Sequence, residues 1–232
     1  MAVPLLRKTA TCVRVAPVRL APGPSAIYSL FFSELAAGLL AYMFWPKNFD
    51  DIDFAQFSEA GPHSGVVAHG VNDNSQSWAK PFKDEFEKNG YDGHVFTVDW
   101  QGYAKNTLRC AIDGKRVGER LEETPSLGSV HLIGHSCGSF VVYGACRAIK
   151  AKNRAIVVQT KYLDPVSIYG LLWRYGINKF GSCADYGEAY IDTGDAIPGS
   201  NKLLPSTRTY DVTAARLRLG STIYPHMWPT YY

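Results

Sequence analysis

The chain has 232 residues and 46% of them are apolar, so it is long enough for one α/β domain and apolar enough to bury a core. This composition excludes a chain that is disordered throughout. The formal net charge of +3 is too small to indicate nucleic-acid binding, and no run of lysines and arginines with interleaved aromatic residues occurs.

The first 45 residues permit two interpretations. Residues 1–25 carry four basic residues, no acid and four prolines, so a regular helix is not expected there. Residues 26–45 are mostly apolar, and the pair of segments could be a signal or signal-anchor sequence. We favour a docking helix at 26–37 followed by a first strand at 39–45, because a spanning helix would hold Glu34 inside the bilayer. We therefore expect an N-terminal extension (1–37) and one domain (38–232).

Strand and helix patterns alternate along the remainder of the chain. This alternation predicts an α/β fold with a mostly parallel central sheet and helices on both of its faces. Strands are predicted at 39–45, 65–68, 94–99, 130–134, 155–163, 189–192 and 208–212, and helices at 78–88, 107–122, 137–150 and 166–175. The glycines Gly138 and Gly144 are expected to let the third helix pack closely on the sheet.

The five cysteines have no spacing typical of a zinc site. We interpret Cys110, Cys137 and Cys146 as buried, small apolar side chains. A bridge between Cys12 and Cys183 remains open.

The motif Gly134-His135-Ser136-Cys137-Gly138 follows a strand pattern and precedes a helix pattern. That order is what the nucleophile elbow of an α/β-hydrolase requires, because the flanking glycines allow the sharp turn that exposes the serine. We therefore predict that Ser136 is a nucleophile at the carboxyl end of a parallel strand.

A serine nucleophile needs a base, and the base needs an orienting acid. In α/β-hydrolases the histidine follows the serine in the chain, and His226 is the only histidine after Ser136. Three aspartates are candidates for the acid: Asp164, Asp192 and Asp195. The usual topology places the acid after the second strand past the nucleophile, which favours Asp195, although topology alone does not settle the choice.

An oxyanion hole requires two backbone N–H groups. The residue after the nucleophile, Cys137, is expected to supply one of them. The second is expected from Val71, which follows the apolar strand that ends in His69-Gly70.

Five segments, in order, resemble the animal-type lipases and phospholipases A1 of the pancreatic-lipase group. They are Leu40 to Phe44 with Asn48 and Phe49, then Ala68-His69-Gly70-Val71 with Trp78, Val98-Asp99-Trp100 with Gly118, the elbow with its strand, and Leu163-Asp164-Pro165. The resemblance spans about residues 38–200 and implies an α/β-hydrolase fold, ester hydrolysis and Asp164 as the acid of the triad. The sequence departs from this group in three ways: Cys137 replaces a leucine, the disulfide-bounded lid has no counterpart, and the chain ends six residues after His226. The group's calcium site falls near residues 185–192, where the acids match poorly, so no metal is predicted.

The sequence thus predicts a serine hydrolase of lipase or esterase type that needs no cofactor and acts on an ester or lipid. A non-catalytic lipid-binding protein, and an acyltransferase or thioesterase with the same triad, are the alternatives. The aromatic-rich segment 166–175 is either a helix packed on the core or an acyl-chain wall or flap beside the site. No nucleic-acid partner is expected, and a membrane or lipid surface is a possible one. From the habit of the resembled group we expect an extracellular protein, with a cytoplasmic or membrane-anchored one as the alternative.

Overall fold

The computed structural model describes residues 38, 52–71, 73–100, 110–169, 172–220 and 223–230. All of them except Gly38 belong to a compact unit, Lys47–Tyr232. The predicted docking helix at 26–37 and the predicted strand at 39–45 lie outside the described residues. Within the described part of the chain, no helix is both long enough and apolar enough to span a bilayer.

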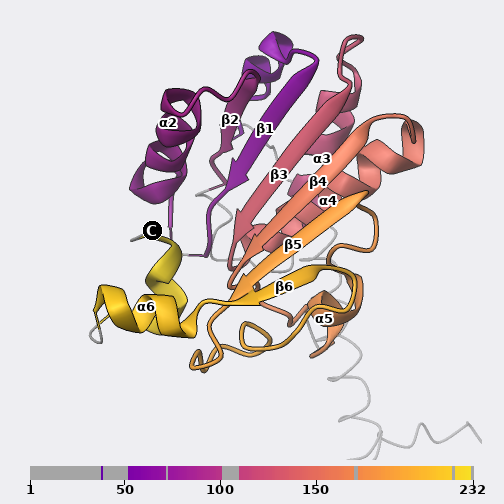
Figure 1. Ribbon diagram of the computed structural model, residues 1–232. Helices are drawn as coiled ribbons and strands as arrows, with labels where there is room; N and C mark the ends of the chain where they lie inside the picture. The colour runs from indigo at the N-terminus through magenta and orange to yellow at the C-terminus, as the bar shows by residue number, and fades with distance from the viewer. Residues whose placement is uncertain are drawn as a thin grey trace, which may run out of the picture. The chain divides into compact units, whose positions relative to one another are not determined.

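Six parallel strands form the central sheet, in the order β2-β1-β3-β4-β5-β6 (Figure 1). Because all six strands run the same way, their carboxyl ends meet at one edge of the sheet, which is the lower edge in Figure 1. The strand bounds are β1 His63–Ala68, β2 His94–Val98, β3 Ser129–His135, β4 Val157–Leu163, β5 Tyr186–Ile191 and β6 Arg208–Asp211. Six of the predicted strands correspond to these.

Alternate residues of the strands enter two apolar clusters, one on each face of the sheet. Val66 and Leu132 belong to the larger cluster, whereas the adjacent Val67 and Ile133 belong to the smaller one. Helices α3 (Cys110–Glu122) and α4 (Gly138–Lys152) supply the larger cluster, and they lie together behind the sheet in Figure 1. This arrangement is consistent with an α/β-hydrolase-like fold.

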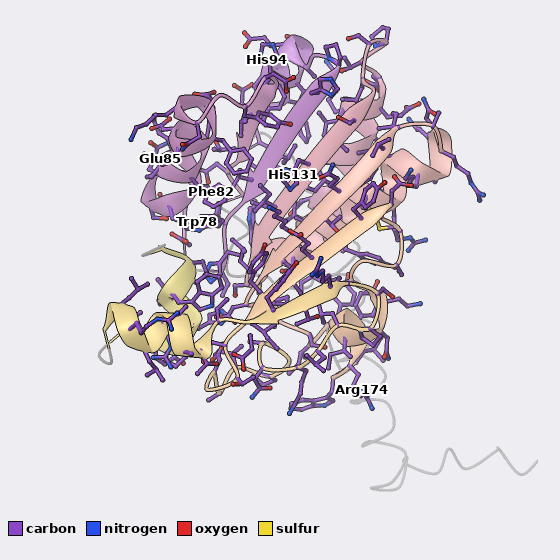
Figure 2. All side chains as sticks on the ribbon, in the orientation of Figure 1. Trp78, Phe82, Glu85, His94, His131 and Arg174 are labelled. Atoms are coloured by element: carbon purple, nitrogen blue, oxygen red, sulfur yellow. A yellow bond between two sulfur atoms is a disulfide. The ribbon has the colours of Figure 1, made fainter. Side chains whose placement is uncertain are left out.

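The opposite face is covered by α2 (Lys80–Lys88), which a turn of π-helix (Ser75–Ala79) precedes. Trp78 and Phe82 point from this segment toward the sheet (Figure 2). Trp228, in the 3-10 helix Pro225–Thr230, belongs to the same cluster. Another 3-10 helix, Phe54–Glu59, precedes β1 and contributes Phe57 to the larger cluster.

The predicted helix at 166–175 is wrong. Two backbone N–H groups at its start bond to distant partners: Val166 donates to the carbonyl of Ser136, and Ser167 to that of Pro198. Tyr169 and Leu172 then pair with each other across a tight turn. A short helix, α5 (Tyr175–Lys179), begins where the predicted one ends. The sequence pattern also missed α6 (Thr213–Leu219), which follows β6 directly.

Cys146 is buried, as predicted, but it forms a disulfide with Cys183 instead of packing only as a small apolar side chain. Because Cys183 is used in this bond, a Cys12–Cys183 bridge is excluded. The Cα atoms of the pair are 6.0 Å apart, and the bond ties α4 to the segment after α5. Cys110 and Cys137 are buried, as predicted, and neither belongs to a disulfide.

Gly144 serves a different purpose from the predicted one. A Cβ atom at Gly144 would lie 2.3 Å from the carbonyl oxygen of Ala111, so this glycine lets α4 approach α3 rather than the sheet. At Gly138 a Cβ atom would meet the carbonyl oxygen of Ala68 at 2.3 Å, so the start of α4 does pack against the end of β1.

Candidate active site

Ser136 lies at the turn between β3 and α4 with a φ of 53°, in the left-handed region that a non-glycine residue adopts only at a cost. Its N–H donates to the carbonyl of Leu163, and its own carbonyl accepts from Ser139. A Cβ atom at Gly134 would lie 2.6 Å from the backbone of Gly138, so the motif glycine at that position is required by space. The turn therefore has the strained strand–turn–helix form that the motif predicts.

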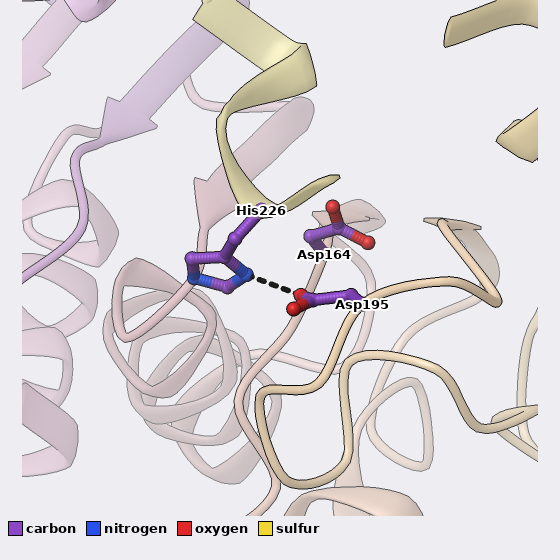
Figure 3. A group of neighbouring side chains, drawn as sticks. All are labelled: Asp164, Asp195 and His226. Atoms are coloured by element: carbon purple, nitrogen blue, oxygen red, sulfur yellow. Dashed lines mark hydrogen bonds and ion pairs between the residues drawn. The ribbon is translucent and has the colours of Figure 1, made fainter. Parts of the chain in front are cut away.

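His226 is brought to this turn from the other end of the chain. Its Nε2 lies 2.7 Å from the Oγ of Ser136. On the other side of the ring, Nδ1 lies 2.7 Å from Oδ2 of Asp195 (Figure 3). With the proton on Nδ1, the ring donates to the carboxylate and leaves Nε2 to accept from the serine hydroxyl. The three side chains thus form one hydrogen-bonded path.

Asp164 does not bond to His226, contrary to the expectation taken from the lipase resemblance. Its Oδ1 accepts the N–H of Asp192 at 2.8 Å, and its backbone is itself strained, with a φ of 41°. In Figure 3 its carboxyl lies beside the pair formed by His226 and Asp195. The aspartate that bonds to the imidazole follows β5, which is the position that the topological argument favours.

The loop after β5 fixes the carboxylate of Asp195. Its Oδ1 accepts the N–H of Ile197 at 2.9 Å, and its carbonyl accepts the side-chain amide of Asn201 at 2.7 Å. Ser200 is fully buried, with its Oγ 3.5 Å from Nδ1 of His226. The second oxygen of Asp195 is thereby left facing the histidine.

Asp192, the third candidate acid, forms a buried ion pair with Arg216 of α6. Its other oxygen accepts from Gly194 and from the hydroxyl of Thr213. These bonds tie α6 to the end of β5, and no role beside the imidazole is left for this side chain. The sequence pattern did not single out Arg216.

The pKa of Asp164 is raised to about 8, chiefly by burial and also by the nearby carboxylates of Asp195 and Asp192, against the hydrogen bond from the Asp192 amide. The side chain is therefore largely uncharged at neutral pH. A neutral carboxyl beside the Asp195–His226 pair adds no second negative charge to it.

The segment His69-Gly70-Val71 passes beside the elbow. A Cβ atom at Gly70 would lie 3.0 Å from the Cβ of Ser136. A hydrogen bond with Cys110 lowers the pKa of the Cys137 thiol against the effect of burial, and a hydrogen bond from the backbone N–H of Val71 lowers it further. The two residues predicted to donate to an oxyanion, Val71 and Cys137, are thus neighbours.

His69 and Trp100 hold this segment in place. The Nε2 of His69 accepts the N–H of Trp100 at 3.1 Å, and the indole N–H of Trp100 donates to the carbonyl of His69 at 3.0 Å. Nδ1 of His69 donates to the carbonyl of Gly70, and the two rings stack with centroids 5.1 Å apart. Burial lowers the pKa of His69, which is consistent with a neutral ring that both donates and accepts.

His135 connects the elbow to the segment that carries His226. Its Nε2 donates to the backbone carbonyl of His226 at 2.9 Å. The ring is buried between His226, with centroids 5.1 Å apart, and Trp78, 5.6 Å away. Burial lowers the pKa of His135 to about 4, so the ring is neutral at neutral pH. His135 occupies one of the two variable positions of the motif, so the motif carries no signal for this contact.

Asp164, Asp195 and His226 could in geometric terms offer ligands to one cation, because their ligand atoms lie within 4.8 Å of one another. A cation there would compete with the existing bond between Asp195 and Nδ1 and with the proton on Asp164. Near the calcium position of the resembled lipases, Asp185 pairs with Lys150 and Asp192 with Arg216. These acids are therefore committed to other partners.

The segment 166–175, considered either as core or as an acyl-chain wall or flap, has both buried and exposed side chains. Tyr169 and Tyr175 pack on the buried Phe140, as core residues do. Leu172 and Trp173 are 59% and 67% exposed. An apolar groove of about 840 Å³ lies elsewhere, between α2, the ends of β4 and β5, and Trp228.

No protein-family model and no curated protein matches this chain. Among solved structures, it is similar to a lipase-esterase related protein from Clostridium acetobutylicum ATCC 824. That similarity has a TM-score of 0.42 and 10% sequence identity, over 65% of this chain and 85% of that one. These comparisons place the chain in no family, the pancreatic-lipase group included.

Proposed function

We propose that the protein is a serine hydrolase that cleaves carboxylic esters, of lipase or esterase type, through an acyl-enzyme. The observation that supports this best is the hydrogen-bonded path from Ser136 through His226 to Asp195, with 2.7 Å at each step. The strained turn at Ser136 adds to that support, because such turns hold a serine hydroxyl toward its base.

The proposed reaction has two halves. The Oγ of Ser136 attacks the ester carbonyl carbon as its proton passes to Nε2 of His226, and the carbonyl electron pair moves onto oxygen. Collapse of this intermediate expels the alcohol oxygen, which takes the proton from His226 and leaves an acylated serine. Water then attacks the acyl carbon, gives a proton to His226, and collapse releases the acid and returns the proton to Ser136.

Asp195 and two backbone N–H groups would stabilise the charges that develop during the reaction. Asp195 stays ionised, keeps the proton on Nδ1 and stabilises the imidazolium that forms. The N–H groups of Val71 and Cys137 are proposed to bind the oxyanion, each lowering the barrier by about 3–4 kcal/mol. A cofactor is not needed for any of these steps.

Hydrolysis of a soluble short-chain p-nitrophenyl ester tests the proposal. Turnover is expected below the solubility limit of the ester, and Ser136→Ala should lower kcat about 10⁶-fold. Equal rates for the two proteins would contradict the proposed nucleophile, and a rate that begins only above the solubility limit would contradict a soluble esterase. When an alcohol is added, formation of a new ester instead of the free acid indicates acyl transfer. A parallel assay with a thioester substrate detects thioesterase activity.

A further inference from the structure

Exposed apolar side chains are concentrated in the segments beyond the carboxyl ends of three strands. Among the described residues, nine large apolar side chains are exposed, and two of these, Val157 and Tyr186, stand at the starts of strands. The other seven lie in the segments that follow β4, β5 and β6, beyond the ends of those strands. Apolar groups collected on one side of a molecule in this way mark an interaction surface more often than singly scattered ones do.

Two loops bring one group of these residues together. The N–H of Ser167, after β4, donates to the carbonyl of Pro198, after β5, at 3.2 Å. Beyond this bond, Trp173 and Leu203, 67% and 69% exposed, border one hollow of about 500 Å³. The same loop carries Ser200, which lies against His226. We call Leu172, Trp173, Arg174, Lys202 and Leu203 the Trp173–Leu203 patch.

A second apolar group lies in the segment that leads into His226. Leu217 and Leu219 of α6 are 51% and 52% exposed, and Tyr224 is 54% exposed. Met227, directly after His226, is 39% exposed. In Figure 1 helix α6 lies at the end of the molecule where the strands terminate. Exposed apolar side chains thus occur in all three segments that follow β4, β5 and β6. The segment after β6 is the one that carries His226.

The charges of these segments have one sign at the surface. The segments that follow the three strands, residues 164–183, 192–206 and 212–230, contain three acids, Asp164, Asp192 and Asp195, and all three are buried. The exposed Asp211 is the last residue of β6. The three segments also contain four exposed cations: Arg174, Lys179, Lys202 and Arg218. Figure 2 shows Arg174 at the lower margin of the molecule. Exposed apolar side chains among lysines and arginines match the two layers of an anionic bilayer surface, the acyl boundary and the phosphate groups.

We propose that this edge of the molecule docks onto an anionic lipid bilayer. The apolar members of the Trp173–Leu203 patch enter the interface, and Arg174 and Lys202 lie against lipid phosphates. Docking would place the carboxyl edge of the sheet, where Ser136 lies, against lipid esters; in that respect the inference rests on the proposed function, although docking itself requires no catalysis.

Vesicle co-sedimentation tests the proposal with the full chain carrying Ser136→Ala, so that the lipid stays intact. The vesicles contain phosphatidylcholine alone or with about 30% phosphatidylglycerol, at low and high salt. Binding is expected to the anionic vesicles and to weaken as salt screens the charges. Trp173→Ser and Lys202→Glu should each weaken this binding on the order of tenfold, relative to the parent.

Matched changes at the opposite edge serve as controls. Tyr186 is 66% exposed at the start of β5, and Arg154 is exposed between α4 and β4, so Tyr186→Ser and Arg154→Glu alter the same properties away from the proposed surface. Both should bind like the parent. The proposal is overturned if the parent does not bind, if it binds both vesicle types equally, or if the controls lose as much binding as the patch variants. Ester turnover by the unmodified protein in solution is measured separately, so failure of docking and failure of catalysis are distinguishable.

Discussion

Asp195 and Asp164 both lie close to His226, but their carboxyl groups meet different partners. Asp195 is bonded to the imidazole, whereas Asp164 is bonded to the amide of Asp192 and is largely protonated at neutral pH. The sequence places an aspartate after each of two neighbouring strands and contains nothing local that ranks them. Only the folded path of the loop after β5 decides which carboxylate reaches Nδ1.

We predict that Asp195→Asn and Asp164→Asn differ sharply in their effect on ester turnover. Asparagine at 195 cannot stabilise the imidazolium and can select the wrong tautomer of His226, so kcat should fall about 10⁴-fold. Asparagine at 164 keeps an oxygen for the amide of Asp192, and activity should stay within a few-fold of the parent. Steady-state kinetics at pH 7.5 measures both, and a larger loss at 164 than at 195 would reverse the assignment.

Asp164 should also shape the dependence of stability on pH. Its pKa is raised in the folded protein, so the native state holds a proton that the unfolded chain has lost between about pH 4 and pH 8. The free energy of unfolding should therefore fall as pH rises through that window. Asp164→Asn removes this decline, about 3–4 kcal/mol, when urea unfolding at pH 5 and pH 8 is compared. An unchanged difference between the two pH values would exclude a strongly raised pKa.

At the scale of secondary-structure elements, the strand and helix patterns predicted the alternation of the sheet and its covering helices, but not the loops at its carboxyl edge. The apolar spacing of residues 166–175 suits a helix, yet tertiary bonds from Val166 and Ser167 hold that backbone in an irregular path. The local spacing of apolar residues carries no information about hydrogen bonds to residues that are far away in the sequence. Helix α6 was missed for a related reason, because its buried Arg216 is satisfied by Asp192, far away in the sequence.

The bond from His135 to the carbonyl of His226 joins the elbow to the 3-10 helix Pro225–Thr230. His135→Phe removes the donor, so we expect kcat to fall about 10–100-fold through displacement of His226, with KM changed little. His135→Gln can still donate and should recover part of the rate. Turnover is compared with the melting temperature of each variant; equal turnover in the glutamine and phenylalanine variants would show that the hydrogen bond is irrelevant.

The Cys146–Cys183 disulfide closes a loop with a sequence separation of 37 residues. Replacing both cysteines by alanine should lower the free energy of unfolding by about 2–4 kcal/mol, because the unfolded chain regains freedom. Denaturant unfolding of the variant and the parent measures this, and dithiothreitol should destabilise the parent alone. If the parent contains two free thiols at these positions, this part of the account is wrong.

For the molecule as a whole, the fold class could be predicted from the sequence. Parallel strands and the helices between them have a characteristic spacing of apolar residues and a characteristic length, and neither depends on distant contacts. The elbow and the choice of His226 followed from a motif and from elimination. Topology favoured Asp195 as the acid and the lipase resemblance favoured Asp164, so the sequence alone did not decide between them. The disulfide and the role of His135 could not be predicted, because each depends on which segments meet in the folded chain. A disulfide is typical of proteins in oxidising compartments, which supports our proposal of an extracellular location.

The central claim is that His226 and Asp195 make one serine hydroxyl reactive. Treatment with a fluorophosphonate probe, followed by peptide mass spectrometry, tests it most directly. The account predicts one phosphonyl group per chain, on Ser136, that persists in Asp164→Asn and is lost in Ser136→Ala and His226→Ala. Absence of labelling, as in a lipid-binding protein without catalysis, or labelling at another residue, would contradict it.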